Sequence, residues 1–165
     1  MSKDGKNTVM IGAHPSGSGS VITYNQAGAP SVRIGSDDKS DGYMNVKRKS
    51  GKNALYVGVG EDGNNVIVSS NSKGKPALVA GVNEDDNGYL KTMNHQNKNS
   101  IIIGSKKDGS GYLSTFSNAG KQSSFISSDR EGNGMLGLYD KAQKLQFTQK
   151  GVKPVINKTP KDKKK

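Results

Sequence analysis

The stretch VGVGEDG, residues 57–63, places Gly58, Gly60 and Gly63 in the spacing G-x-G-x-x-G. In dinucleotide-binding proteins this spacing follows a strand and opens a helix, whose amino end holds the pyrophosphate. Here the next residues, NNVIVSSN, are rich in Val and Ile and predict a strand. Because the helix is missing, the motif does not predict a nucleotide site, and the glycines need another explanation.

Other patterns that could hold a metal or a phosphate each lack an essential residue. The segment DDKSDG, residues 37–42, resembles the start of a calcium loop, but Lys39 stands where an oxygen ligand is needed. The segment GAHPSGSG, residues 12–19, has no Lys after its second Gly, so it does not match a phosphate-binding loop. The two histidines, His14 and His95, have no carboxylate at a metal-ligand spacing.

We therefore expect no catalytic residue, no metal site, no cofactor and no enzymatic activity. The chain has no cysteine, which removes thiol chemistry and disulfides. The acidic residues that recur in the polar segments are expected to cap backbone N–H groups of turns, as Asp commonly does.

A 23-residue repeat explains the glycines. One apolar row with a constant step consists of Ile11, Ile34, Val57, Ala80, Ile103 and Ile126. The residue after each is Gly in the first five copies, so Gly58 belongs to the repeat. Another row with the same step is Gly19, Gly42, Asn65, Gly88, Gly111 and Gly134. No insertion breaks the register, which is typical of a repeat architecture.

Each unit is predicted to be a β-hairpin. The segments NQAGA, RKSGK and NSKGK fit a type I turn that ends in a left-handed residue with a bulge. The predicted turn residues are Gly28, Gly51, Gly74, Asn97 and Gly120. Asn97 is the expected replacement, because Asn adopts the left-handed conformation most readily after Gly. A longer polar loop, such as VNEDDNG, then returns the chain, giving about twelve antiparallel strands in up-and-down order and no helix.

The strands are predicted to have one apolar face. The inner-face core residues are Ile34, Leu55, Val57, Leu78, Leu90, Ile101, Ile103, Leu113, Ile126 and Leu136. The opposite face is mixed and carries a row of tyrosines, Tyr43, Tyr89 and Tyr112. A single-layer sheet with one apolar face needs a covering layer in water. Three copies around an axis would supply it as a triangular β-prism about 58 Å long.

The alternative is a single-chain β-solenoid, in which each unit is one coil. It would stack equivalent lysines of successive units, such as Lys52 and Lys75, about 4.8 Å apart, well inside a Debye length. In the meander the same lysines are about 9.6 Å apart. The charges and the turn pattern both favour the all-β antiparallel meander.

Composition supports an elongated or multi-chain fold. Hydrophobic residues make up 30% of the chain and aromatic residues 5%, too few for one compact core. The domain prediction is a lead-in at 1–10, a hairpin shaft at 11–148 and a flexible basic tail at 149–165. No signal sequence precedes the repeats and no apolar stretch reaches a membrane-span length, so we expect synthesis in a cytoplasm without signal-directed export.

The basic tail is the strongest local charge. Its lysines that could attach to an acidic partner are Lys158, Lys161, Lys163, Lys164 and Lys165, and the alternative is a merely solubilising end. No aromatic residue follows Phe147, so base stacking by the tail is not available and nucleic acid is not an expected partner.

The unit DGSGYLSTFSNAGKQSSFIS, residues 108–127, resembles the glycine-rich β-repeats of fibrous appendages of bacteriophages and related bacterial proteins. The resemblance implies a structural virion protein: a short homotrimeric fibre or spike on the head or tail, bound to other virion proteins. It also implies adhesion to a host-surface glycan as a further role. The other reading is a β-solenoid carbohydrate- or surface-binding module that uses the tyrosine row.

Overall fold

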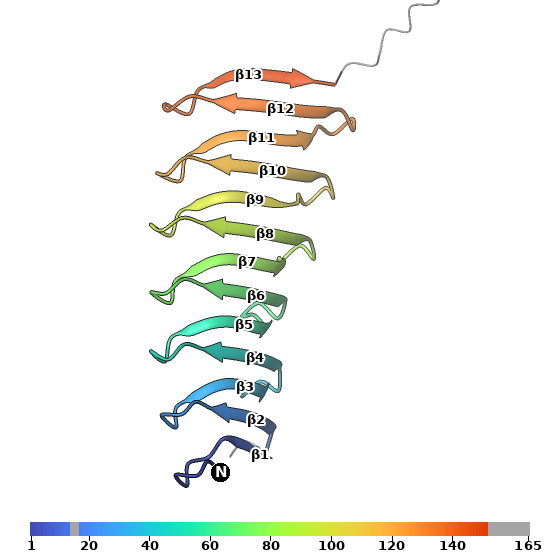
Figure 1. The fold of residues 1–165 in the computed structure, drawn as a ribbon. Helices are drawn as coiled ribbons and strands as arrows, with labels where there is room; N and C mark the ends of the chain where they lie inside the picture. The colour runs from blue at the N-terminus through green and yellow to red at the C-terminus, as the bar shows by residue number, and fades with distance from the viewer. Residues whose placement is uncertain (14–16, 152–165) are drawn as a thin grey trace, which may run out of the picture.

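The computed structural model describes residues 1–13 and 17–151, which form one open sheet of thirteen strands. Each strand pairs antiparallel with its neighbours in the sequence, so the sheet order is the chain order. Figure 1 shows the resulting ladder, a single layer with a row of loops at each side. The meander is confirmed. The solenoid alternative is wrong, because coils of a solenoid would place parallel strands side by side, whereas every neighbouring pair here is antiparallel.

The strands are short and regular. They are β1 (Val9–Ala13), β2 (Gly19–Tyr24), β3 (Pro30–Ser36), β4 (Gly42–Lys47), β5 (Asn53–Val59), β6 (Asn65–Ser70), β7 (Pro76–Val82), β8 (Gly88–Met93), β9 (Asn99–Ser105), β10 (Gly111–Phe116), β11 (Gln122–Ser128), β12 (Gly134–Tyr139) and β13 (Leu145–Lys150). The sheet thus runs from Val9 to Lys150, two residues beyond each end of the predicted shaft. Thirteen strands span about 58 Å at about 4.8 Å per strand.

The loops at the two sides of the sheet are the same turn. In the 25–29 loop, the Asn25 N–H donates to the Ala29 carbonyl at 2.9 Å and the Gly28 N–H to the Asn25 carbonyl at 2.8 Å. In the 37–41 loop on the other side, the equivalent bonds measure 2.9 Å and 3.0 Å. The expectation of a longer return loop is therefore wrong, because each connection described in full has the same five-residue turn.

The fourth residue of each loop is left-handed. The predicted turn residues Gly28, Gly51, Gly74, Asn97 and Gly120 have φ between 61° and 83°. The return loops contain equivalent residues at Ser40, Gly63, Asp86, Gly109 and Gly132. Along the chain these residues alternate at steps of 12 and 11 residues. Each 23-residue unit therefore consists of two related half-units, one strand and one turn each.

Side chains at the start of most loops hold the turn closed. Asn25 Oδ1 accepts from the N–H groups of Ala27 and Ala29 at 2.9 Å and 3.0 Å. The 60–64 and 106–110 loops use the third residue instead: Asp62 Oδ1 accepts from the Asn64 N–H at 3.1 Å and Asp108 Oδ1 from the Ser110 N–H at 3.0 Å. The predicted capping by loop acids is confirmed at Asp62 and Asp108.

The repeated Ile-Gly positions let neighbouring strands approach closely. A Cβ added to Gly81 would overlap the carbonyl oxygen of Asn65, and one on Gly35 would lie 3.0 Å from the carbonyl oxygen of Gly19. At Gly58 the added atom would lie 2.9 Å from the Cβ of Tyr43. Since Gly63 is left-handed as well, the spacing that resembles a nucleotide fingerprint has a structural cause.

We predict that Gly81→Ala destabilises the sheet by about 1–3 kcal/mol, because the Asn65 backbone cannot move away without disturbing the strand pair. Gly12→Ala is the matched control: Gly12 occupies the same repeat position in the first strand, and an added Cβ meets nothing within 4 Å. Urea unfolding of both variants measures the difference. Equal midpoints for the two variants would contradict the close-approach explanation.

The sheet encloses no core. Ile22 is the one apolar side chain in the described residues that is buried, and the buried polar ones are Ser70 and Ser114. The chain exposes 12040 Å², whereas a compact monomer of this mass exposes roughly 7,900 Å². The excess is larger than the roughly 2,300 Å² that fourteen terminal residues can expose at full extension. The shaft itself is therefore unusually exposed for a monomer.

Candidate functional site

The candidate functional site is the apolar face of the sheet, which we define by two central rows of cross-strand neighbours. In one row Val21, Ile34 and Met44 lie directly opposite one another, and the row continues through every strand. The second row lies two residues away in each strand. All ten predicted inner-face residues lie on this face: Ile34, Leu55, Val57, Leu78, Leu90, Ile101, Ile103, Leu113, Ile126 and Leu136.

These residues do not form a core within one chain. Ile126 is 55% exposed, Ile34 48% and Ile103 44%. Nearly all large exposed hydrophobic side chains of the described strands lie on the apolar face. A shallow hollow of about 550 Å³ also opens there, lined by Ile34, Met44, Val57, Ile67 and Ala80 among others. So large a contiguous apolar surface marks an interaction site in a soluble protein.

Charged side chains are excluded from the apolar face in the strands that the structure describes. The four charged strand residues, Arg33, Lys47, Lys91 and Lys150, all belong to the opposite face, which we call the outer face. A face meant for water would carry some of these charges. Such a one-sided distribution is typical of a face that is shielded from water.

The tyrosine row lies on the outer face but is not a cluster. Tyr43 belongs to β4 and Tyr89 to β8, so three strands separate them, and Tyr112 follows in β10. Lys91 Nζ lies 4.8 Å from the ring centre of Tyr89. The structure therefore presents these rings at intervals along the sheet rather than as one binding pocket.

Tyr56 is an outer-face residue that sequence reasoning missed. Its ring stacks on Tyr43 with 6.3 Å between ring centres, and its hydroxyl donates to the Val59 carbonyl at 3.0 Å. Burial, followed by the nearby carboxylates of Asp37 and Asp41, raises the pKa of the Tyr56 hydroxyl. Tyr56 gave no repeat signal, because no other unit has Tyr at this position.

The loops at one side of the sheet carry most of the acidic residues. We define the acidic edge as the loops 37–41, 60–64, 83–87, 106–110 and 129–133, which lie on the right in Figure 1. They contain eleven Asp and Glu residues against four Lys and Arg residues, a net charge of −7. The acids are Asp37, Asp38, Asp41, Glu61, Asp62, Glu84, Asp85, Asp86, Asp108, Asp129 and Glu131.

The loops at the other side are basic. We define the basic edge as the turn 2–6 and the loops 25–29, 48–52, 71–75, 94–98, 117–121 and 140–144. They contain eleven Lys and Arg residues against two Asp residues, a net charge of +9. The bases are Lys3, Lys6, Arg48, Lys49, Lys52, Lys73, Lys75, Lys98, Lys121, Lys141 and Lys144. Sequence reasoning missed this segregation because it counted the charge of the shaft as a whole.

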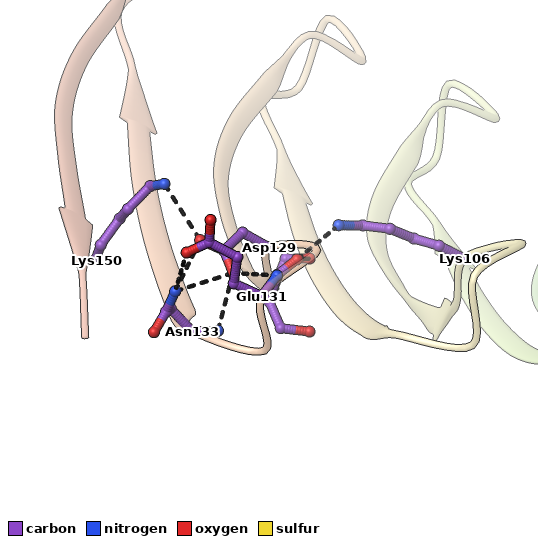
Figure 2. Close-up of polar contacts among 7 residues, drawn as sticks. Lys106, Asp129, Glu131, Asn133 and Lys150 are labelled. Carbon is purple, nitrogen blue, oxygen red and sulfur yellow. Dashed lines mark hydrogen bonds and ion pairs between the residues drawn. The ribbon is translucent and has the colours of Figure 1, made fainter. Parts of the chain in front are cut away.

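A polar network closes the C-terminal end of the acidic edge (Figure 2). Lys150 Nζ lies 3.2 Å from Asp129 Oδ2, and the Asn133 N–H donates to Asp129 Oδ1 at 2.9 Å. Lys106, in the preceding loop of this edge, donates from its Nζ to the Ser128 carbonyl at 3.1 Å. Bonds from the Asn133 backbone and side chain, with Lys150 and Glu131 contributing less, lower the pKa of Asp129 to about 2.

We predict that Asp129 titrates near pH 2 and that Asn133→Ala raises its pKa towards the ordinary value of 3.8. Because the pKa is lower in the folded state, ionised Asp129 stabilises the fold above pH 3.8 and loses this effect as the pH falls through about 2. Carbon NMR of the side-chain carboxyl measures both values. Titration of the unaltered protein near 3.8 would contradict the network shown in Figure 2.

The remaining sequence-predicted residues do not form a chemical site in the described chain. His95 lies exposed in the 94–98 loop, and His14 lies outside the described residues. Within residues 1–13 and 17–151, no three His, Cys, Asp or Glu side chains are grouped to hold a metal ion, and no helix of membrane-spanning length and hydropathy occurs. The tail lysines, Lys158, Lys161, Lys163, Lys164 and Lys165, lie outside the described residues.

Comparison with known proteins adds no assignment: the chain matches no protein-family model and no curated protein. The candidate site must therefore be interpreted from its own geometry and charge.

Proposed function

We propose that the protein is a non-enzymatic structural protein that assembles as a homotrimeric rod, the short fibre or spike of a phage particle. The observation that carries the proposal is the uncovered apolar face of a one-layer sheet. With strands about 20 Å long, the face measures about 1,200 Å² over the length of the rod, and a stable interface buries about 800 Å² per partner. Covering this face with sister chains therefore meets the size of a stable interface.

The width of the sheet fits three chains around one axis. Packed sheets lie about 10 Å apart, so side chains extend about 5 Å from each sheet. An equilateral prism with sides of about 20 Å has its axis about 6 Å from each side. Side chains from three apolar faces would then meet at the axis without leaving a channel, as a packed interior requires.

Sedimentation equilibrium tests the assembly. We expect a species with three times the 17.4 kDa chain mass at micromolar concentration. A folded monomer under these conditions would overturn the proposal, and a dimer would replace the prism with two facing sheets.

The assignment to a phage particle rests on the resemblance of the repeat unit to phage appendage repeats. Mass spectrometry of purified particles together with an electron-microscopy map tests it. Finding the chain in host cell fractions but not in particles would reject this part of the proposal while leaving the rod intact.

A second candidate role is adhesion through the outer face. The observation that favours it is the placement of Tyr43, Tyr89 and Tyr112 opposite the apolar face, where they stay accessible after assembly. Retention on immobilised host glycan by the assembled protein, lost in the triple Tyr→Ala variant, would support the role. Equal retention of both proteins would reject the tyrosine row as the binding surface.

A further inference from the structure

The opposite charges of the two loop edges cannot serve to attract the edges of one chain to each other. Strands of six or seven residues separate the edges by about 20 Å, more than twice the Debye length of about 8 Å at physiological ionic strength. Within each edge, most loops carry the same sign and follow one another about 9.6 Å apart, which is unfavourable for an isolated chain. The exceptions are the 106–110 loop, with net +1, and the uncharged 25–29 loop. The segregation of charge becomes favourable only when an edge of opposite sign lies alongside.

We propose that in the assembled rod the acidic edge of each protomer lies against the basic edge of the next, with all chains parallel. The inference rests on the proposed self-assembly and specifies its geometry. The partner is a second copy of this chain, chosen by charge complementarity between a net −7 edge and a net +9 edge.

Symmetry makes the charge pattern diagnostic of chain direction. Rotation about the rod axis carries one protomer onto the next and brings unlike edges together at every corner. A twofold axis across the rod would make the chains antiparallel and place acidic edge on acidic edge and basic edge on basic edge. The observed charges favour the first arrangement and oppose the second.

A row of glycines at the acidic edge supports a close neighbour there. Gly42, Gly88 and Gly111 begin strands on the side of the apolar face, next to acidic loops. An added Cβ meets nothing within 4 Å at Gly42 and comes no closer than 4.0 Å to any atom at the other two. None of the three is left-handed. The chain itself therefore does not require glycine here, whereas small residues suit the narrow corner of a prism. Asn65 is the larger residue of this row, and Val59 lies opposite it.

The basic edge has small residues at the equivalent place. The extra residue of each strand bulge is Ser31, Ala54, Ala77, Ser100 and Ser123 in the first five hairpins. Ser31 Oγ lies 2.8 Å from the hydroxyl of Thr23, which places the Ser31 side chain on the apolar face. Across β3 and β9 the apolar face is thus small, large, large and small, which matches a triangular interior that narrows towards its corners. β5 and β7 depart from this pattern at the acidic edge, where they carry Val59 and Val82.

The loops of the two edges can also interleave. Because the strands alternate in direction, acidic and basic loops alternate along the rod, each lying one strand further than the last. At a corner of parallel chains in the same register, each acidic loop then lies between two basic loops of the neighbour. The 83–87 loop, for example, comes level with the gap between the 71–75 and 94–98 loops of the next chain.

Charge reversal tests the proposal with exposed residues at matched positions. The acidic-edge variant is Asp38→Lys, Glu61→Lys and Glu84→Lys, and the basic-edge variant is Lys49→Glu, Lys73→Glu and Lys141→Glu. The acidic-edge changes bring that edge from net −7 to −1, and the basic-edge changes bring the other from +9 to +3. A third protein combines both sets and has both weakened edges. The control carries Arg33→Glu, Lys47→Glu and Lys91→Glu on the outer face, the same change in net charge as the basic-edge variant.

Sedimentation equilibrium at low and physiological salt then gives the dissociation constant of each protein. Either single-edge variant should assemble at least about 100-fold more weakly, because most of the charge of one edge is lost at every corner, and the combined variant should assemble no better than either single-edge variant. The outer-face control should assemble like the unaltered protein. If the single-edge variants assemble as well as the control, the parallel edge pairing is overturned, although the rod survives. If the unaltered protein itself sediments as a monomer, the proposed function fails first.

Discussion

Replacing Ile103 with aspartate is expected to dissociate the proposed homotrimer, whereas replacing the adjacent Ile102 with aspartate should leave it assembled. Ile103 lies on the apolar face and Ile102 on the outer face of the same strand, β9. In a trimer, three aspartates at position 103 would face one another near the axis. Each buried charge costs several kcal/mol, so the dissociation constant should rise by more than about 1,000-fold.

The two variants separate the models clearly, because the burial of the two side chains in a single chain predicts the opposite order of tolerance to aspartate. In one chain Ile103 is exposed and Ile102 is partly buried, so a protein that works as a monomer would tolerate aspartate better at 103. Sedimentation equilibrium reads the assembly, and circular dichroism shows whether each variant keeps its strands. Assembly retained by Ile103→Asp but lost by Ile102→Asp would show that the outer face is the interface.

The fold was predictable because turn geometry limits the residues that can occupy it. Gly at the fourth loop position, replaced by Asn97 in one copy, indicates a left-handed residue, and that alone gives the hairpins and the antiparallel order. The return loops concealed the same turn. There the left-handed position is filled by Ser40 and Asp86 in two copies, residues that do not stand out in a polar segment.

The apolar face was predictable from alternation, but its exposure needed the structure. Period-two patterning places Ile101 and Ile103 on one face whether or not anything covers it. The row at Gly42 and Gly88 was visible as a repeat, yet its cause was not. The structure shows that neither the backbone conformation nor the chain's own packing requires glycine there.

The charged loop residues are visible in the sequence, but the strand order is needed to assign each loop to one edge of the sheet. Neighbouring loops such as 71–75 and 83–87 are close in sequence and opposite in charge, so any window average cancels them. Sorting the loops by strand direction separates the two signs. Tyr56 was not predictable for another reason: the Tyr43–Tyr56 pair that stacks occurs in one unit only, so the repeat pattern does not point to it.

Deleting one whole repeat unit, residues 59–81, should shorten the rod by two strands, about 10 Å, and preserve both the sheet and its assembly. The deletion joins Gly58 to Val82, so the next loop, 83–87, stays on the acidic edge and the two faces keep their residues. Since strands contact only their sequence neighbours, all other pairings remain as they were.

Deleting a half-unit, residues 60–70, should preserve the sheet but weaken assembly by at least about 100-fold. This deletion joins Val59 to Asn71 and removes one strand and one loop, so Asn71 takes the place of Gly60 as the first residue of the turn. Paired as around the 60–64 loop, Val57 then lies opposite Leu78 and the apolar face stays continuous. Every strand after the junction reverses its direction, so the basic 71–75 loop moves to the acidic edge and the acidic 83–87 loop moves to the basic edge. Both edges then carry mixed charge.

Circular dichroism should show similar strand content for the two deletions, and sedimentation equilibrium should separate them. Equal assembly of both would mean that the apolar face alone directs association, with no contribution from the order of charges along the edges.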